Sequence, residues 1–514
     1  MIIKTNELKQ DQHLGDLQLQ VYNGLDTMIT LEVFNKIAAE RQLDFTRNTP
    51  AHSIYDFERA LQAPALEMML RGIKIDGYER EKAAALIRNQ IGRLADILDR
   101  YVEAIRGTKL KPRPARFAHM ACRYTFPGSK TQLEEFFYRV MKLPEQWKYT
   151  KGQRKLSMDR ETLEKLQVYW HAQPVILCVL KIRELGDMLE VIETEIDHDG
   201  RWRQSYNIAG TDTGRASSSA SSTGTGSNAM NITPELRNMF ISDIGYKLIA
   251  IDFEQSEARD LGWWCWILFG DSTYLDACES GDLHTVVASM SLKHLPWTGD
   301  SKKDREIAEQ PFYRGDSIRQ ANKVLGHGSN YLGSPYTMSK HTHIPQKMIE
   351  KFQHDYFGAF PCLPRLHRWV AQELQTKQQI TSFFGRTRHF FGRPTDDTTL
   401  REAVANMGQS PTADRTSLVM WRIWKHCRRA QLLHEVYDAV YCQARESDEQ
   451  EVVEQIKGLA RVELTHNGRK FLVPIEVKTG WNWGNYEAKS NPNGLKKFSG
   501  VDTRKRAEGL DRVL

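Results

Sequence analysis

The chain has 514 residues and a formal net charge of +6, with 40% hydrophobic and 26% charged residues. This composition excludes disordered and collagen-like chains, and the longest notable apolar run, residues 263–269, is far shorter than the roughly 20 residues of a membrane span. The start of the chain turns polar too early for a secretory signal, and the seven cysteines contain no Cys-x-x-Cys pair. We therefore expect a cytoplasmic protein with no membrane partner and, by length, about three domains.

The N-terminal third is predicted to be mainly helical. Residues 27–41 predict a helix, and Asn23 or Asp26 is a suitable residue to cap its start. Residues 79–106 place apolar side chains at near-helical spacing, which predicts a long amphipathic helix.

Positive charge is concentrated just after that helix. Residues 101–160 contain 14 Lys or Arg but only 5 Asp or Glu. Within them, residues 109–116 predict a basic loop, because Pro112 and Pro114 forbid a regular helix. A helix that leads into a basic loop is typical of a contact with nucleic-acid phosphates. Charge alone, however, favours a solvated basic face.

The middle and the end of the chain alternate strand signals with polar segments. Residues 202–208 predict a strand, and the small residues of 210–227 are compatible with a linker, although Asp212 and Arg215 interrupt them. The polar and basic residues from Lys489 onward predict a loosely ordered tail.

Two apolar strands lead to aspartates that are far apart in the sequence. Residues 246–251 precede Asp252, and residues 432–442 contain Asp438. Neighbouring strands would bring both carboxylates to one sheet edge, where they repel unless divalent cations lie between them. This arrangement is typical of two-metal phosphoryl transfer, and oxygen ligands favour Mg²⁺. Either aspartate alone is better interpreted as a turn or cap residue.

A basic helix makes the two-metal interpretation stronger. Residues 317–331 carry Arg319, Lys323, His327 and Tyr331 at intervals of four, so these side chains form one stripe. Arginine and lysine one turn apart can hold a triphosphate, and an aromatic ring can stack on a base or a sugar. The residues between them are apolar or small: Ala321, Val324, Leu325 and Gly328.

At these residues the sequence resembles family A DNA polymerases, the group of bacterial polymerase I and phage replicases. Residues 252–259 resemble motif A, the stripe from Arg319 to Tyr331 resembles motif B, and residues 436–438 resemble motif C. Further matches in the expected order are residues 126–133, 152–166, 213–218, 228–232, 236–240, 282–285, 384–388, Gln409 and 480–483. The likeness covers about residues 60–485.

The resemblance implies a role for each matching residue. The metal ligands would be Asp252, the Phe253 carbonyl and Asp438, which would hold two Mg²⁺ ions, with Mn²⁺ as a substitute. Lys323 would be catalytic together with the two aspartates, and Glu257 would be the steric gate that excludes a ribose 2′-hydroxyl. The residues expected to bind the nucleotide are Arg319, Lys323, His327, Tyr331, His284, Glu257 and Arg237. The residues expected to bind DNA are Arg215, Asn231, Arg401, Gln409 and Tyr437.

The sequence departs from the family pattern at several of these positions. Motif C reads Tyr437-Asp438-Ala439 where the family has His-Asp-Glu, so the third carboxylate is absent. A shifted register would place His434-Glu435 at the site, but it puts Val436 where a polar residue belongs.

Two further departures lie in motifs B and A. His327 replaces a phenylalanine or tyrosine, which adds a group that titrates near neutrality. Glu254 replaces a small serine, either as an outer-sphere carboxylate or as a solvent-facing or Arg-paired residue.

The N-terminus resembles only the last motif of the family's proofreading exonuclease, at residues 22–26. We therefore expect a chain that does not proofread by itself, or one in which Asp26 completes an exonuclease on a separate polypeptide.

The architecture implied is α+β and mainly helical: a right-hand polymerase fold with a palm built on an antiparallel sheet, fingers and a thumb. The expected boundaries are 1–58 for the exonuclease-like remnant, 59–200 for the thumb, 201–260 and 401–485 for the palm, 261–400 for the fingers and 486–514 for a basic tail.

The expected function is DNA-directed DNA synthesis, as in a phage replicase in the host cytoplasm. Its partners would be primer-template DNA, deoxynucleoside triphosphates and a separate exonuclease or other replisome proteins. The alternatives are a single-subunit RNA polymerase, against which Glu257 argues, and a non-catalytic DNA-binding assembly factor, against which Asp252, Lys323 and Asp438 argue.

Overall fold

The computed structural model describes residues 12–41, 53–107, 129–150, 152–500, 504 and 506. The chain forms two compact units, Met1–Gln62 and Ala63–Leu514. The basic loop expected at residues 109–116 lies outside the described residues, as do residues 126–128 of the resemblance.

The smaller unit contains α1 (Gln12–Arg41) and the start of α2 (Ile54–Arg71). The expectation that a helix starts at Asn23 or Asp26 is wrong, because both residues lie inside α1. The Thr27 hydroxyl donates to the Asn23 carbonyl at 2.7 Å, a bond between successive turns of the helix. Residues 27–41 are therefore helical as predicted, but the helix begins further upstream, at Gln12.

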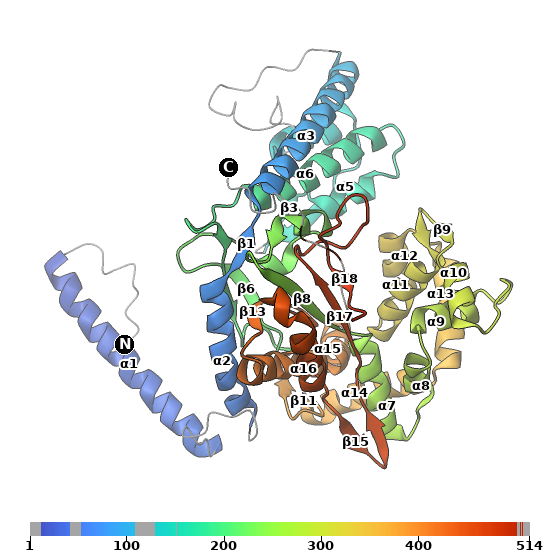
Figure 1. The fold of residues 1–514 in the computed structure, drawn as a ribbon. Coiled ribbons are helices and arrows are strands. Elements are labelled where there is room, and N and C mark those ends of the chain that lie inside the picture. The colour runs from blue at the N-terminus through green and yellow to red at the C-terminus, as the bar shows by residue number, and fades with distance from the viewer. Residues whose placement is uncertain are drawn as a thin grey trace. The chain divides into compact units, whose positions relative to one another are not determined.

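The larger unit is built around a five-stranded antiparallel sheet (Figure 1), and the predicted antiparallel sheet is confirmed. Its strands, in spatial order, are β13 (Gln431–Val436), β14 (Ala439–Arg445), β8 (Tyr246–Phe253), β17 (Ile475–Gly480) and β18 (Lys496–Lys497). Residues 247–251 of the central strand β8 are all buried, and all of them except Lys247 are apolar. On β8, Asp252 lies opposite Ala439 of β14 and Glu476 of β17.

Two long helices pack side by side at one end of this unit (Figure 1). The predicted helix at 79–106 is α3 (Gly77–Arg106), and its partner is α6 (Gln173–Glu193). Asp76 caps α3 by accepting the Glu79 N–H at 3.0 Å, and Gly107 ends it in the left-handed conformation at φ 66°. Smaller elements of this end are α4 (Lys130–Glu134), η4 (Glu135–Val140), β2 (Trp147–Thr150), β3 (Gln153–Leu156) and α5 (Arg160–Leu166).

A second group of helices follows β8 and has its own hydrophobic core, whose buried members run from Leu261 to Met407. These helices are α7 (Ser256–Phe269), α8 (Thr273–Glu279), α9 (Leu283–Ser291), α10 (Ser301–Ala308), α11 (Ile318–Asn330), α12 (Pro335–Thr342), α13 (Gln346–Ala359) and α14 (Cys362–Lys377). Short strands flank them: β9 (Pro311–Tyr313), β10 (Asp316–Ser317), β11 (Gln379–Thr381) and β12 (Thr387–His389). The long helix α15 (Asp397–His426) then leads back to the sheet.

The strand expected at residues 202–208 is divided in two, because its halves have different partners. In a three-stranded sheet, β4 (Arg201–Trp202) pairs with β1 (Ile73–Ile75), which also pairs with β7 (Phe240–Ile241). The other half, β5 (Gln204–Asn207), pairs with β6 (Ser217–Ala220). The small residues from 210 to 227 are therefore partly a strand, and the linker interpretation is wrong. The short helices η5 (Ala229–Asn231) and η6 (Pro234–Met239) follow.

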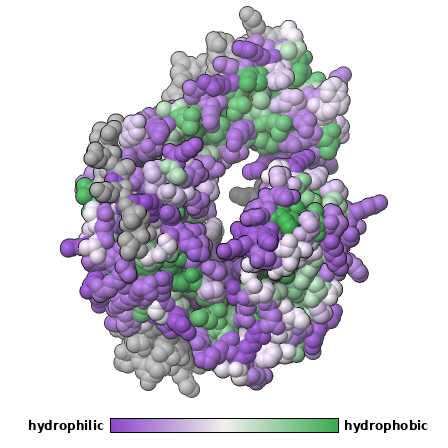
Figure 2. Space-filling view, turned by 45° about the vertical axis from the view of Figure 1, so that its right-hand side comes forward, coloured by the Kyte–Doolittle hydropathy of each residue, from purple (hydrophilic) through white to green (hydrophobic). Residues whose placement is uncertain are grey.

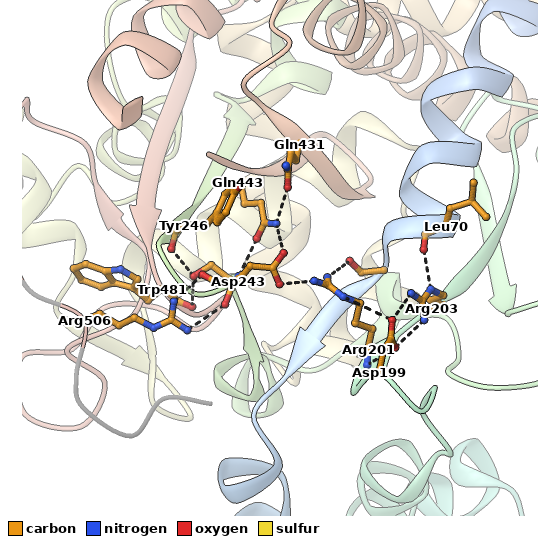
Figure 3. A network of polar contacts seen from close by, with 12 residues as sticks. Leu70, Asp199, Arg201, Arg203, Asp243, Tyr246, Gln431, Gln443, Trp481 and Arg506 are labelled. Carbon is orange, nitrogen blue, oxygen red and sulfur yellow. Dashed lines mark hydrogen bonds and ion pairs between the residues drawn. The ribbon is translucent and has the colours of Figure 1, made fainter. Parts of the chain in front are cut away.

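A polar network joins the three-stranded sheet to the five-stranded one (Figure 3). Arg201 and Asp243 form an ion pair at 2.5 Å. The Gln443 side-chain amide donates to Asp243 at 2.7 Å, and Arg506 donates to the Asp243 carbonyl at 2.7 Å. The Asp243 carboxylate thus connects β4 with β14, and its backbone carbonyl binds Arg506.

The expectation of a loosely ordered tail from Lys489 is wrong for residues up to 500. Strand β18 pairs with β17, and Leu495 is buried. The Trp481 N–H donates to the Asn493 carbonyl at 2.7 Å, and the Leu495 N–H donates to the Gly484 carbonyl at 2.7 Å. Backbone pairing orders this segment, and a hydrophobicity pattern does not reveal such pairing.

The remaining elements of the sheet region are η7 (Glu446–Asp448), α16 (Glu449–Leu459), β15 (Leu464–His466) and β16 (Arg469–Phe471). None of the helices described has the length and apolar character of a membrane span.

Candidate active site

The structure places Asp252 and Asp438 on neighbouring backbone segments, as their strand contexts predicted. Asp252 is the next-to-last residue of β8, and Asp438 lies in the tight turn between β13 and β14. The Phe253 N–H donates to the Asp438 carbonyl at 3.4 Å. Tyr437 adopts a positive φ of 57°, which lets the chain reverse direction at this point.

Both carboxylates are half-buried, and this changes their ionisation. The pKa of Asp252 is raised to about 7, chiefly by burial and then by the negative charge of Asp438. Burial also raises the pKa of Asp438. A pair of this kind resists double ionisation unless cations compensate it, and carboxylate oxygens fit a hard divalent cation.

The described residues offer no third ligand side chain: no group of three or more His, Cys, Asp or Glu among them is placed to hold a metal ion. Glu476 lies opposite Asp252 but is paired with Lys478 at 2.9 Å and Lys497 at 3.3 Å. The two aspartates are therefore the candidate metal ligands of this site.

The alternative register of motif C is excluded because the two residues that it would place at the site are buried. His434 and Glu435 lie in β13, and these residues are only 2% and 3% exposed. The His434 ring stacks on Tyr441 at 4.6 Å between ring centroids. Neither residue is accessible to a substrate, whereas Asp438 is only half-buried at the end of the strand.

Helix α11 carries the predicted stripe. The Ser317 hydroxyl caps it by accepting the Gln320 N–H at 3.1 Å, while Ala321 and Leu325 face the core. Lys323 and His327 are exposed. Within the described part of the chain, Lys323 forms no ion pair, so its ammonium group is available to an anion.

Arg319 and His284 lie with Lys323 in one cluster of basic side chains, of which His284 is uncharged at neutral pH. Arg319 donates to both oxygens of Asp282, at 2.5 and 3.0 Å. Asp282 immediately precedes α9, on which His284 lies. Burial, together with the charges of Arg319, Lys323 and His327, lowers the pKa of His284 to about 4. These groups therefore lie close enough to share one polyanionic ligand.

A second network surrounds Glu257 at the start of α7. Arg215 pairs with one of its carboxylate oxygens, and the Tyr331 hydroxyl donates to the other. The Tyr331 ring makes an edge contact with His327, with centroids 4.7 Å apart. The Arg215 guanidinium lies 5.6 Å from the centre of the Tyr437 ring.

This network extends from the β13–β14 turn to α11, because the Tyr437 hydroxyl also donates to Asn231 at 3.2 Å. Six of the predicted site residues are joined in it: Asn231, Tyr437, Arg215, Glu257, Tyr331 and His327. Burial and the Glu257 charge raise the pKa of Tyr331, so the phenol stays a hydrogen-bond donor.

Three predicted residues lie outside these two clusters. Arg237 stacks over the Trp483 ring at 4.8 Å and donates to the Ile232 carbonyl. Arg401 is exposed on α15 and bonds to its own helix at the Asp397 carbonyl. Gln409 is half-buried further along α15.

Sequence reasoning missed the buried polar network that holds α7 against α15. Asp260 and Arg415 form an ion pair at 2.5 Å, with side chains 0% and 1% exposed. The Thr412 hydroxyl oxygen lies within hydrogen-bond distance of both the Asp260 carboxylate, at 2.9 Å, and the Ser256 hydroxyl, at 2.8 Å. The available signal was the pair of charged residues inside otherwise buried helices, but nothing in one sequence joins two positions 155 residues apart.

A family model described as DNA polymerase family A matches residues 115–485. The chain belongs to DNA polymerase family A.

Individual relatives agree with this assignment. The chain is 28% identical over 378 residues to "DNA polymerase I, thermostable" from Thermus aquaticus, a match that covers 69% of this chain and 41% of the relative. It is 24% identical over 501 residues to "DNA polymerase I" from Chloroflexus aurantiacus, with 91% of this chain and 46% of the relative covered. The chain thus spans less than half the length of these curated relatives.

A solved structure has the same fold. It is described as the POL domain of Pol1 from M. smegmatis in complex with DNA primer-template and dNTP. It superposes with a TM-score of 0.63 at 20% sequence identity, covering 82% of this chain and 69% of that one. The predicted α+β right-hand polymerase fold is therefore confirmed.

Proposed function

We propose that the chain is a DNA-directed DNA polymerase that extends a primer on a DNA template with deoxynucleoside triphosphates. The observation that carries the proposal is the pairing of Asp252 and Asp438 in one site with the cationic stripe of α11. The two aspartates are suited to bind divalent cations, and the stripe of α11 is suited to bind a triphosphate. The complex named for the solved structure, with primer-template and dNTP, supports the same substrates.

In this proposal Asp252 and Asp438, with the Phe253 carbonyl, hold two Mg²⁺ ions, for which Mn²⁺ can substitute. Bound there, the ions would lower the pKa of the primer hydroxyl and neutralise charge on the triphosphate. Arg319, Lys323 and His284 orient the phosphates, and Lys323 donates a proton to the departing pyrophosphate.

Glu257 and Tyr331 close the sugar site, and Arg215, Asn231, Tyr437, Arg401 and Gln409 contact the primer-template. The minor groove offers nearly the same acceptors at every base pair, so contacts there tolerate any sequence. Residues 59–200 form the thumb in this proposal, 201–260 and 401–485 the palm, and 261–400 the fingers. Figure 2 shows a hollow bordered largely by hydrophilic residues, of a kind that a charged duplex would occupy.

Primer extension tests the proposal directly. The purified chain is expected to extend a primer with dNTPs in the presence of Mg²⁺, and to do so far less efficiently with rNTPs. Equal use of rNTPs would favour an RNA polymerase, and an absence of extension in either case would favour a non-catalytic DNA-binding factor.

Removing the free ammonium of α11 is expected to slow chemistry. Lys323→Met should lower kcat by roughly 100- to 1,000-fold, the usual effect of losing a charged donor at a reacting group. Single-turnover extension at saturating dNTP measures it. Lys340→Met on α12, whose ammonium lies over the Tyr336 ring, is a matched control that should keep the wild-type rate. An equal loss in both variants would contradict the role of Lys323.

Truncating the side chain of Glu257, the proposed steric gate, is expected to allow the incorporation of ribonucleotides. Glu257→Ala should reduce the preference for dNTP over rNTP, measured as the ratio of kcat/KM values, by at least roughly tenfold. The reason is that the carboxylate now held by Arg215 and Tyr331 would no longer fill the space beside the sugar. A variant that loses all extension equally with both substrates would indicate a structural effect instead.

A further inference from the structure

Gly408 lies against the network around Glu257. It is a buried residue of α15, and a Cβ atom at this position would lie 2.7 Å from the Tyr331 hydroxyl oxygen and 3.4 Å from the Glu257 Cβ. Glycine is less favourable than alanine inside a helix. Its presence here therefore has a steric rather than a conformational explanation.

Buried hydrogen bonds hold α15 against α7 on both sides of Gly408, and they oppose a shift of Gly408 away from α7. The Trp264 indole donates to the Met407 carbonyl at 3.1 Å. One turn beyond Gly408, the Thr412 hydroxyl donates to Ser256 at 2.8 Å. Both partners belong to α7, the helix that also carries Glu257.

The group that must yield to a methyl group at position 408 is therefore Tyr331. Its hydroxyl donates to Glu257, and its ring is held at the edge of His327. Displacing the hydroxyl would break the bond to Glu257 and leave that carboxylate held by Arg215 alone.

We propose that Gly408 is a specificity-determining residue for the sugar of the incoming nucleotide. By presenting no side chain, it lets the Tyr331 hydroxyl reach Glu257 and so fixes the shape of the sugar site. This inference rests on the proposed polymerase function.

A thermal-unfolding cycle tests the geometry without any need for activity. Gly408→Ala is expected to lower the Tm, although the same change at the exposed Gly458 of α16, where no atom lies within 4 Å, should leave it unchanged or raise it. Tyr331→Phe removes the hydroxyl, so adding Gly408→Ala to Tyr331→Phe should cost far less than in the wild type. An equal loss of Tm in both backgrounds would overturn the proposal.

Nucleotide selection tests the function. Gly408→Ala should lower the ratio of kcat/KM for dNTP over rNTP by roughly tenfold, the effect of losing one hydrogen bond, whereas Gly458→Ala should keep the wild-type ratio. An unchanged ratio in Gly408→Ala, in a protein that extends primers, would overturn the inference and leave the polymerase proposal intact. A wild-type protein that extends no primer would overturn the polymerase proposal, and the unfolding cycle would still decide whether Gly408 accommodates Tyr331.

Discussion

Asp252→Asn and Asp438→Asn are each expected to lower primer extension by at least about a thousandfold. The amide keeps the shape of the side chain but removes the negative charge that, in the proposed mechanism, would hold a divalent cation and so activate the primer hydroxyl. Steady-state extension with Mg²⁺ measures the loss. Glu476→Gln is the matched control, because Glu476 lies opposite Asp252 and is already paired with two lysines. A similar loss in Glu476→Gln would mean that all three carboxylates act together.

When a chelator removes divalent cations, Asp252→Asn is expected to be more stable than the wild type. The folded-state pKa of Asp252, about 7, exceeds the ordinary value of 3.8. The folded protein therefore holds a proton that the unfolded chain releases between these values, and stability falls as pH rises through this window. Asp252→Asn removes that penalty, so its Tm should exceed the wild-type Tm at pH 8 and approach it at pH 4. Added divalent cation should raise the Tm of the wild type alone.

Equal Tm values at pH 8 for the wild type and Asp252→Asn would contradict the raised pKa of Asp252. If Mg²⁺ raised the Tm of the wild type and of Asp252→Asn equally, the cation would bind elsewhere in the molecule.

The second large effect is expected at Arg415, in the core rather than at the active site. Arg415→Ala should lower the free energy of unfolding by about 3–5 kcal/mol, because it leaves the Asp260 carboxylate buried without its counter-charge. Urea unfolding measures the change. Replacing both partners, with Asp260→Leu and Arg415→Met, should recover most of the loss, since apolar side chains of similar volume pack in place of the pair.

An exposed ion pair provides the control for this prediction. Arg429 and Glu451 have side chains that are 53% and 69% exposed, so Arg429→Ala should leave unfolding nearly unchanged. If Arg415→Ala were no worse than Arg429→Ala, the buried pair would not be what holds α7 against α15.

The parts of the site that the sequence predicted are those that depend on local periodicity. Asp252 could be placed at a strand end because residues 248–251 are uniformly apolar, and Arg319 and Lys323 could be placed on one face because helical geometry fixes their spacing. The resemblance then related these elements to Asp438, which no periodicity could do. The α+β fold followed from the same motifs.

The parts that could not be predicted depend on contacts between distant segments. No local sequence pattern shows that Arg415 contacts Asp260. Nor does any show that β18, which contains Lys497, pairs with β17 opposite Lys478 and so adds an edge strand to the sheet. The same limit explains the error at the C-terminus, where residues without apolar character are ordered by backbone hydrogen bonds. The interpretation of Arg237 was incomplete for a related reason, since its position over Trp483 joins residues about 250 apart.

The strand order of the central sheet also determines when this protein can fold during its synthesis. Among the described strands, β8 pairs only with β14 and β17, so Asp252 meets its first sheet partner after some 190 further residues have been translated. At roughly 5–20 residues per second, that wait is about 10–40 seconds. All buried members of the hydrophobic core between Leu261 and Met407 emerge in that interval. The inserted helices can therefore collapse first, and Asp252 and Asp438 meet late, when β13 and β14 leave the ribosome.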